Sequence, residues 1–442
     1  MEITHYCNSF LSVKINDTII VCDPWTGVTR DNAWLSYPNY NISEKFFKNL
    51  NPNFIYISHL HCDHFDPKTL NKFNKNTSII IKKFKDSRLK KRILDLGFKN
   101  IIEFNSWHKK KLNKDLTISL IPQISNNSED IDNGIFYDLD SSIIIQSNHD
   151  KKIFFNTVDN PLSVKNLKFI KNYINKKFKS DIFAACMPVG SASEYPHCFF
   201  DINKGTKKKR VISQILGQVK KKINIIKQNI FFPAGGNYIL YGKFAKLDKF
   251  IATPNFSETY KKIKTKKTKV VNLLGKTLMV KNRNLKIYKV TTGTKQFTRS
   301  QLKNKFKNKK YHYENIKTNI SKDNLDKLYK QCLEKYYWRL SHNKINSSWD
   351  VNFFVYKNLK LKSSEKIINS KKNLLKKYSL SYKKNTKRHS SLECHLDAKL
   401  FISLLQRTYP WNPVLSGSMI LFKRNPDKFD PNLTFSLNYL GL

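Results

Sequence analysis

The stretch Ile57–Asp66 constrains this chain more than any other, because it holds four potential metal ligands within six residues. The apolar run Phe54–Ile57 at its start is predicted to form a buried strand. Alternation along an extended segment would place the first two imidazoles on one side of the backbone. The potential ligands are His59, His61, Asp63 and His64. Imidazole and carboxylate groups at this spacing suit a zinc-like or iron-like ion, and the set could serve two ions.

The pattern His-x-His-x-Asp-His resembles the signature of the metallo-β-lactamase superfamily. The resemblance implies an α/β fold, the αββα sandwich, over residues 1–255. It also implies that Asp63 orients or deprotonates the attacking water, and that His64 helps to hold a second ion. Asp159 follows the apolar run Phe154-Phe155, which is where this superfamily places a metal-bridging carboxylate. The other interpretation of Asp159 is a turn or helix-capping residue.

A more specific resemblance lies in the segment Asp23-Pro24-Trp25, which is followed by Trp34 and Pro38. It is similar to a subgroup that includes proteins linked to surface-polysaccharide synthesis and the lactamase-like part of CMP-sialic acid hydroxylase. Trp25 and Trp34 are candidates for lining a substrate mouth, or they are aromatic residues that pack within a loop. His197 lies in a loop that resembles the substrate-side loop of this subgroup, and is a weaker candidate for substrate or metal binding.

Two positions depart from the superfamily pattern. A His is expected after the predicted strand Leu116–Ile121, but the residues there are Pro122, Gln123, Ser125 and Asn126, followed by Glu129, Asp130 and Asp132. The last metal-binding His is replaced by the small-residue turn Ala234-Gly235-Gly236. One ion, or an altered pair of ions, is therefore more plausible than a full two-zinc site.

The length of 442 residues favours two or three domains. We expect a metallo-β-lactamase-like domain over 1–255 that folds alone. A smaller C-terminal α+β domain is expected over 256–442, with the basic connector Lys261–Lys269 near its start. No apolar run approaches the ~20 residues of a membrane span. Seven scattered Cys residues without Cys-x-x-Cys pairs favour reduced thiols and a cytoplasmic location.

The formal net charge of +48 comes mostly from Lys residues spread along the whole chain. Because Arg is scarce and no Arg-aromatic cluster is visible, specific nucleic-acid binding is not expected, whereas an anionic substrate would be attracted. No Walker loop, Rossmann glycine motif or Ser-His-Asp arrangement offers a competing chemistry.

Three hypotheses about function follow. The first is a metal-dependent hydrolase, with one or two zinc ions or with iron, acting on an anionic phosphate-linked or sugar-linked substrate such as a glycan or nucleotide sugar. The second is an oxygenase similar to CMP-sialic acid hydroxylase. A Rieske cluster needs Cys-x-His and Cys-x-x-His, and only the first spacing occurs, at Cys62-Asp63-His64; the oxygenase would need a separate electron-transfer partner. The third is a non-catalytic binding protein with a degenerate metal site.

Overall fold

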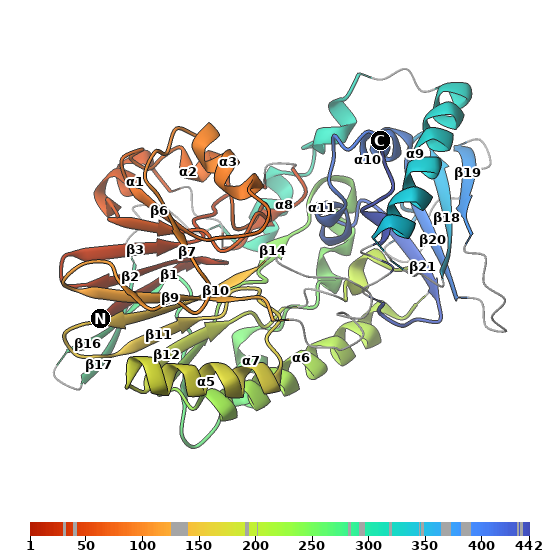
Figure 1. Cartoon of the computed structure of the whole chain (residues 1–442). Helices are drawn as coiled ribbons and strands as arrows, with labels where there is room; N and C mark the ends of the chain where they lie inside the picture. The colour runs from red at the N-terminus through yellow and green to blue at the C-terminus, as the bar shows by residue number, and fades with distance from the viewer. Residues whose placement is uncertain are drawn as a thin grey trace.

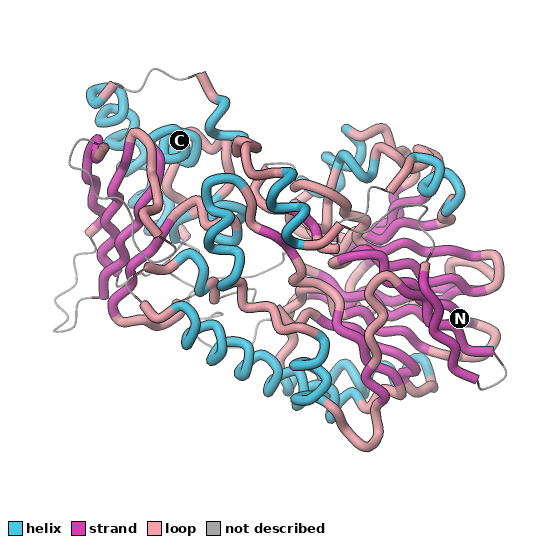
Figure 2. Tube along the Cα trace, turned by 180° about the vertical axis from the view of Figure 1, so that it is seen from behind, coloured by secondary structure: helices cyan, strands magenta, loops and turns pink. Residues whose placement is uncertain are grey.

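The structure is a computed structural model, and Figures 1 and 2 show two lobes that lie side by side. It describes residues 1–29, 32–38, 42–124, 140–190, 194–200, 202–281, 284–290, 297–317, 321–343, 345, 349–363, 373–381, 390–430, 433 and 436–442. Among these residues, no helix is both long enough and apolar enough to cross a membrane.

The larger lobe is built on two sheets that face each other (Figure 1). Within the described residues the first sheet has the order β17-β16-β1-β2-β3-β5-β6-β7. Its strands are β1 (Glu2–Cys7), β2 (Phe10–Ile15), β3 (Thr18–Cys22), β5 (Phe54–Tyr56), β6 (Ser78–Lys82), β7 (Ile101–Phe104), β16 (Lys276–Lys281) and β17 (Asn284–Lys289). The half from β3 to β7 is parallel, so its strands end at one common edge.

The second sheet has the order β15-β13-β12-β11-β10-β9-β8. Its strands are β8 (Lys110–Lys111), β9 (Leu116–Pro122), β10 (Ser141–Ser147), β11 (Ile153–Asn156), β12 (Ile182–Met187), β13 (Ile230–Pro233) and β15 (Lys269–Val270). Strands β8 to β11 pair in antiparallel fashion, and β11 to β15 in parallel fashion. The carboxyl ends of β11, β12 and β13 therefore lie next to one another.

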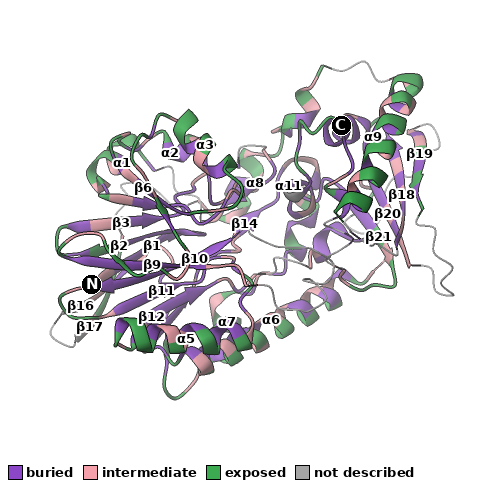
Figure 3. Ribbon diagram, viewed as in Figure 1, coloured by how far each residue is buried: buried purple, intermediate pink, exposed green. Residues whose placement is uncertain are grey.

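Helices cover the outer face of each sheet (Figure 1). They are α1 (Glu44–Leu50), α2 (Pro67–Leu70) and α3 (Arg88–Asp95) on the first sheet, and α5 (Val164–Phe178), α6 (Lys204–Ile226) and α7 (Phe256–Ile263) on the second. Strand β10 shows why this arrangement forms, since Ile143 and Ile145 point into the core between the sheets and Ile144 points toward the helices. Figure 3 shows these strands buried and the outer helix faces exposed. The predicted αββα sandwich is confirmed.

The smaller lobe contains a mixed sheet of order β19-β18-β20-β21 covered by helices. Its elements are α8 (Arg299–Lys305), η3 (His312–Asn315), α9 (Lys322–His342), β18 (Trp349–Tyr356), β19 (Leu374–Leu380), β20 (Ser390–Asp397), α10 (Ala398–Leu405), α11 (Trp411–Ser416) and β21 (Leu421–Asn425). The lobe combines helices with strands, which confirms the α+β class predicted for the end of the chain.

Strands from beyond residue 255 complete both sheets of the larger lobe. Strand β16 pairs with β1 in antiparallel fashion, β17 pairs with β16, and β15 pairs with β13 in parallel fashion. The small sheet of β4 (Leu35–Ser36) and β14 (Tyr238–Ile239), with the helix η2 (Gly242–Phe250), packs into the same hydrophobic core as the C-terminal strands and helices. The larger lobe thus extends past the expected boundary, and the two lobes share one core.

Candidate metal centre

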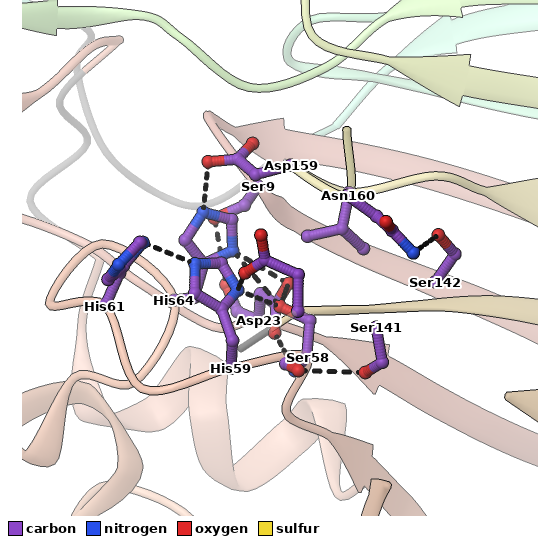
Figure 4. A network of polar contacts seen from close by, with 12 residues as sticks. Ser9, Asp23, Ser58, His59, His61, His64, Ser141, Ser142, Asp159 and Asn160 are labelled. Atoms are coloured by element: carbon purple, nitrogen blue, oxygen red, sulfur yellow. Dashed lines mark hydrogen bonds and ion pairs between the residues drawn. The ribbon is translucent and has the colours of Figure 1, made fainter. Parts of the chain in front are cut away.

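The His-rich segment leaves the sheet directly after β5, at the edge where the parallel strands end. The imidazoles of His59 and His61 meet there, with His59 Nε2 and His61 Nδ1 2.8 Å apart. The ring of His64 lies against that of His59, with 4.1 Å between the ring centroids. Figure 4 shows the three rings gathered at one point. Asp66 caps the N-terminus of α2 behind them, as the Asp-Pro pair predicts.

Two carboxylates approach these rings from the second sheet. Asp159 follows β11, and its Oδ2 lies 3.2 Å from His64 Nε2. Asp140 immediately precedes β10, and its Oδ1 lies 3.5 Å from His59 Nδ1. Within the described residues, two groups have ligand atoms that all lie within 4.8 Å of one another: His59 with His61 and Asp140, and His59 with His64 and Asp159. The site is therefore assembled across the gap between the two sheets.

Asp23 and Ser58 orient two of the three imidazoles. Asp23 is fully buried after β3; its Oδ1 accepts a hydrogen bond from the Ser58 amide, and its Oδ2 accepts one from Ser58 Oγ at 2.7 Å. The same Oδ2 lies 2.9 Å from His64 Nδ1, and Ser58 Oγ lies 2.8 Å from His59 Nδ1. Because the Ser58 hydroxyl donates to Asp23 and accepts from His59, Nδ1 of His59 carries the proton and its Nε2 keeps a lone pair, whereas Nε2 of His64 faces the Asp159 carboxylate. Nε2 of His59 is thus available to a cation, and Nε2 of His64 becomes available when its proton is lost.

The turn that carries Asp159 is tied to the second sheet. Asn160 Nδ2 donates to Ser142 Oγ at 3.0 Å, and Ser142 Oγ donates to the carbonyl of Thr157. Ser163, and not Asp159, caps the N-terminus of α5. The Asp159 carboxylate is consequently left to face His64.

Burial and the neighbouring charges set the protonation of the cluster. Burial lowers the pKa of His61 to about 4 and holds the pKa of His59 well below its usual range, so both rings are neutral at pH 7. Burial alone would also lower the pKa of His64, but the carboxylates of Asp159 and Asp63 raise it well above the usual value. Burial raises the pKa of Asp140 to about 6. Two neutral imidazoles and a protonated third lie beside buried carboxylates, and a cation bound here would take the place of the proton of His64.

One atom tests whether the residues fit a metal. Asp140 Oδ1 is buried, yet it forms no hydrogen bond within the part of the chain that the structure describes. A buried carboxylate oxygen without a partner destabilises the folded state, and a cation beside it removes that penalty. Ligand atoms of His59, His61 and Asp140 all lie within 4.8 Å of one another. The donor set therefore fits a metal ion, whose identity the geometry leaves open.

The predicted ligands divide into two sets. His59, His61, His64 and Asp159 come together as described, whereas Asp63 is set back, its Oδ2 3.9 Å from His64 Nε2. Asp63 is partly exposed, and its carbonyl accepts a hydrogen bond from Ser9 Oγ. Its predicted role beside the metal stays a prediction.

Asp140 was not among the ligands predicted from the sequence. A ligand was expected after β9, where Pro122 and Gln123 lie; residues 125–139, with the Glu and Asp candidates, are outside the described residues. Instead, the neighbouring strand supplies the carboxylate, because Ser141 pairs with Pro122 in the register of β9 and β10. The available signal in the sequence was an Asp immediately before an apolar strand. Only the pairing of β9 with β10 shows that this Asp lies beside the imidazoles.

The small-residue turn after β13, which stands where the superfamily pattern has its last metal-binding His, packs beside Asp159. Gly235 adopts φ +93, and a Cβ there would lie 3.7 Å from Asp159 Oδ1. Gly236 adopts φ +75, and a Cβ there would meet Gly190 Cα at 3.0 Å. The loops after β12 and β13 therefore close tightly over this edge of the site.

The candidate substrate residues lie in the interior. Trp25 is 0% exposed and Trp34 is 4% exposed, and both belong to the core shared by the lobes. His197, in the short helix η1 (Pro196–Cys198), is also fully buried between Ser418 Oγ at 2.6 Å and the Tyr238 hydroxyl at 2.9 Å. None of the three reaches a surface where a substrate could touch it, so the structure does not support a substrate-binding role for them.

Comparison with known proteins finds short matches to curated sequences. A protein of Mycolicibacterium smegmatis, provisionally named a Rieske 2Fe-2S iron-sulfur protein, is 28% identical over 104 residues, which is 23% of this chain and 20% of that protein. A similarly named protein of Mycobacterium tuberculosis is 27% identical over 125 residues, 27% of this chain and 24% of the relative. The chain thus matches only about a fifth to a quarter of the length of these relatives. No family model matches.

Solved structures give distant likenesses. A metallo hydrolase from Ignicoccus hospitalis, Igni18, has a TM-score of 0.40 at 14% identity and covers 66% of this chain and 99% of its own. An isothiocyanate hydrolase from Delia radicum gut bacteria has a TM-score of 0.41 at 14% identity, and the match covers 63% of this chain and 99% of the hydrolase chain. CmlA, a diiron β-hydroxylase from Streptomyces venezuelae, has a TM-score of 0.41 at 11% identity, and the match covers 65% of this chain and 54% of the CmlA chain.

The layer order of the two sheets and the ligand-rich end of β5 together define the class of this protein. It has the metallo-β-lactamase fold, with a histidine and aspartate group placed to bind metal at the sheet edge.

Proposed function

We propose that this protein is a metal-dependent hydrolase that acts on an anionic, phosphate-linked or sugar-linked substrate. The observation that supports this most directly is the convergence of His59, His61 and Asp140. An ion held there, zinc or iron, would lower the pKa of a water from about 16 toward about 7 and so supply a nucleophile at neutral pH. His64 and Asp159 would hold a second ion if one binds.

The chain's own residues then set the geometry of the reaction. Asp23 and Ser58 hold the imidazoles in the required tautomer. Asp63 is partly exposed beside His64, where its carboxylate can orient the attacking water and accept its proton. The net charge of +48 favours the approach of an anionic substrate such as a nucleotide sugar or a polysaccharide precursor.

The second candidate is an oxygenase. Carboxylate and imidazole together suit non-haem iron as well as zinc, and Asp140 in place of a His makes the set richer in carboxylate. The short matches to proteins named for a Rieske cluster favour the same candidate. Because Cys-x-x-His is absent from this sequence, the electrons would come from a separate protein. A binding protein with a degenerate site is the third candidate.

A cytoplasmic location is part of the proposal. None of the seven cysteines forms a disulfide, and six of them are buried. Reduced thiols are typical of proteins in a reducing compartment.

Metal analysis of the purified chain, combined with phosphodiester, phosphomonoester and lactone probes, separates the candidates. Zinc with hydrolysis supports the hydrolase, iron without hydrolysis supports the oxygenase, and a folded protein that binds no metal supports the binding protein. His61→Ala should reduce the metal content sharply, whereas His149→Ala, in an exposed turn, should leave it unchanged. Full metal occupancy in His61→Ala would refute the assignment of the site.

A further inference from the structure

A groove with a cavity volume of about 330 Å³ lies beside the candidate metal centre. Asp159, whose other side faces His64, lines one end of it. The loop after β11 and the loop after β12 form one wall, and α6 forms the other. The groove and the candidate metal centre thus share Asp159.

One face of α6 lines this groove. The lining positions recur every three or four residues, as expected for a single helix face, and are Val211, Gln214, Ile215, Gln218, Val219 and Lys222. At 1.5 Å per residue, the eleven steps from Val211 to Lys222 span about 16 Å. The groove is therefore long in one direction.

The floor of the groove is apolar and its rim is polar. Leu162, Leu167 and Met187 are buried in the floor, beside Val211 and Val219. The amide side chains of α6 belong to exposed residues at the rim. Among the residues that line the groove, none is aromatic. A sugar ring would find no aromatic face to stack on, whereas a hydrocarbon chain would be well accommodated by the buried apolar residues of the lining.

We infer that this groove binds the linear apolar chain of an amphiphilic substrate whose polar, reacting group lies at the metal centre. The length and apolar floor select an extended acyl or alkyl chain, and the shared residue Asp159 connects that chain to the site. The role of the chain as part of a substrate rests on the proposed function, but its binding in the groove does not.

Binding of a fluorescent dansylated undecanoic acid to the full chain tests the groove. Octanoate, decanoate and dodecanoate are then used as competitors. Because a buried methylene contributes about 0.8 kcal/mol, affinity should rise about fourfold with each added methylene.

Two variants of α6 form a matched pair. Gln218→Trp would fill the groove from its rim without burying a charge, and should weaken dodecanoate binding about tenfold or more. Ser213 is exposed on the same helix and does not line the groove, so Ser213→Trp should change binding by less than about twofold. Circular dichroism checks that both variants are folded.

An affinity that does not depend on chain length, or Gln218→Trp binding dodecanoate as tightly as the wild type, overturns the inference. Hydrolysis of a short phosphodiester probe is measured in parallel. A chain-length series that is intact in a protein without any hydrolysis rejects the proposed hydrolase and leaves the groove assignment standing. Hydrolysis of the probe without binding of the carboxylate series rejects the groove assignment and leaves the proposed hydrolase standing.

Discussion

Asp23 connects the imidazoles of the metal centre through one buried carboxylate. It contacts His64 directly and His59 through the Ser58 hydroxyl. The geometry of the ligands thus depends on a residue that lies far from them in sequence and is not itself in either ligand group. Asp140 shows the opposite case, because its Oδ1 lies 3.5 Å from His59 Nδ1 but forms no hydrogen bond among the described residues.

Replacing Asp140 by Asn should weaken metal binding at least about tenfold. The same change should stabilise the metal-free protein at pH 7 by roughly 1–3 kcal/mol, because it removes a buried negative charge whose burial raises the pKa of Asp140 to about 6. Zinc titration and chemical denaturation in the presence of a chelator measure the two effects. Asp150→Asn, in the turn after β10, is the control and should alter neither. Unchanged zinc affinity in Asp140→Asn would show that Asp140 is not a ligand.

At the scale of elements, the site depends on how closely the loops after β12 and β13 approach each other. Gly190 and Gly236 lie in contact, and the latter has a positive φ. A side chain at either position would push the loops apart, and with them the turn beside Asp159. Where the superfamily pattern has a His, this chain thus needs glycine, because the two loops pack closely there.

Gly236→Ala is expected to destabilise the protein by about 1–3 kcal/mol, because φ is positive there and because the added Cβ would lie 3.0 Å from Gly190 Cα. Gly217→Ala in α6 is the matched control. It meets no atom within 4 Å and lies in a helix interior, so it should stabilise the protein by about 0.5–1 kcal/mol. Urea denaturation measures both. Equal effects of the two substitutions would contradict the close approach of the loops.

At the scale of the whole molecule, the segment 194–200 connects the lobes. His197 bridges Tyr238 and Ser418, and Glu194 contacts Arg424. Strands beyond residue 255 complete the sheets. We therefore propose that the division between the lobes lies after β17 rather than at 255, although the shared core keeps the lobes together.

The buried His197 should make the protein sensitive to acid. Burial lowers its pKa to about 3, from about 6.5 in the unfolded chain. The unfolded state therefore binds the proton first, and stability falls as the pH drops from about 6.5 toward 3, by about 3 kcal/mol at pH 4. His197→Gln should be less stable at pH 7 but lose less stability on acidification, as measured by denaturation at several pH values. An identical pH dependence in wild type and variant would rule this out. His149→Gln is the exposed control.

Truncation tests the proposed division. A fragment of residues 1–290 keeps both sheets, so hydrogen exchange should show protected strands, although loss of the shared core lowers its stability. A fragment of residues 1–255 lacks β15 and β16 and should aggregate. A soluble 1–255 fragment with protected sheets would show that these strands are dispensable.

The local pattern was sufficient for some features and not for others. The apolar run Phe54–Ile57 and the Asp66-Pro67 start predicted the strand before His59 and the helix after it, because these depend on neighbours within a few residues. The interior positions of Trp25 and Trp34 were left undecided, since an aromatic loop residue can face a core or a mouth. Their burial depends on helices and strands far along the chain.

By itself, the sequence determined the sandwich class, which the resemblance of the His-x-His-x-Asp-His motif implies, and the gathering of imidazoles after β5, which follows from ligand spacing. Only the tertiary structure decided that Asp140 completes the ligand group, that strands from beyond residue 255 close the sheets, and that Asp159 also lines a groove. These features arise from strand register and packing between distant segments, which local pattern does not encode.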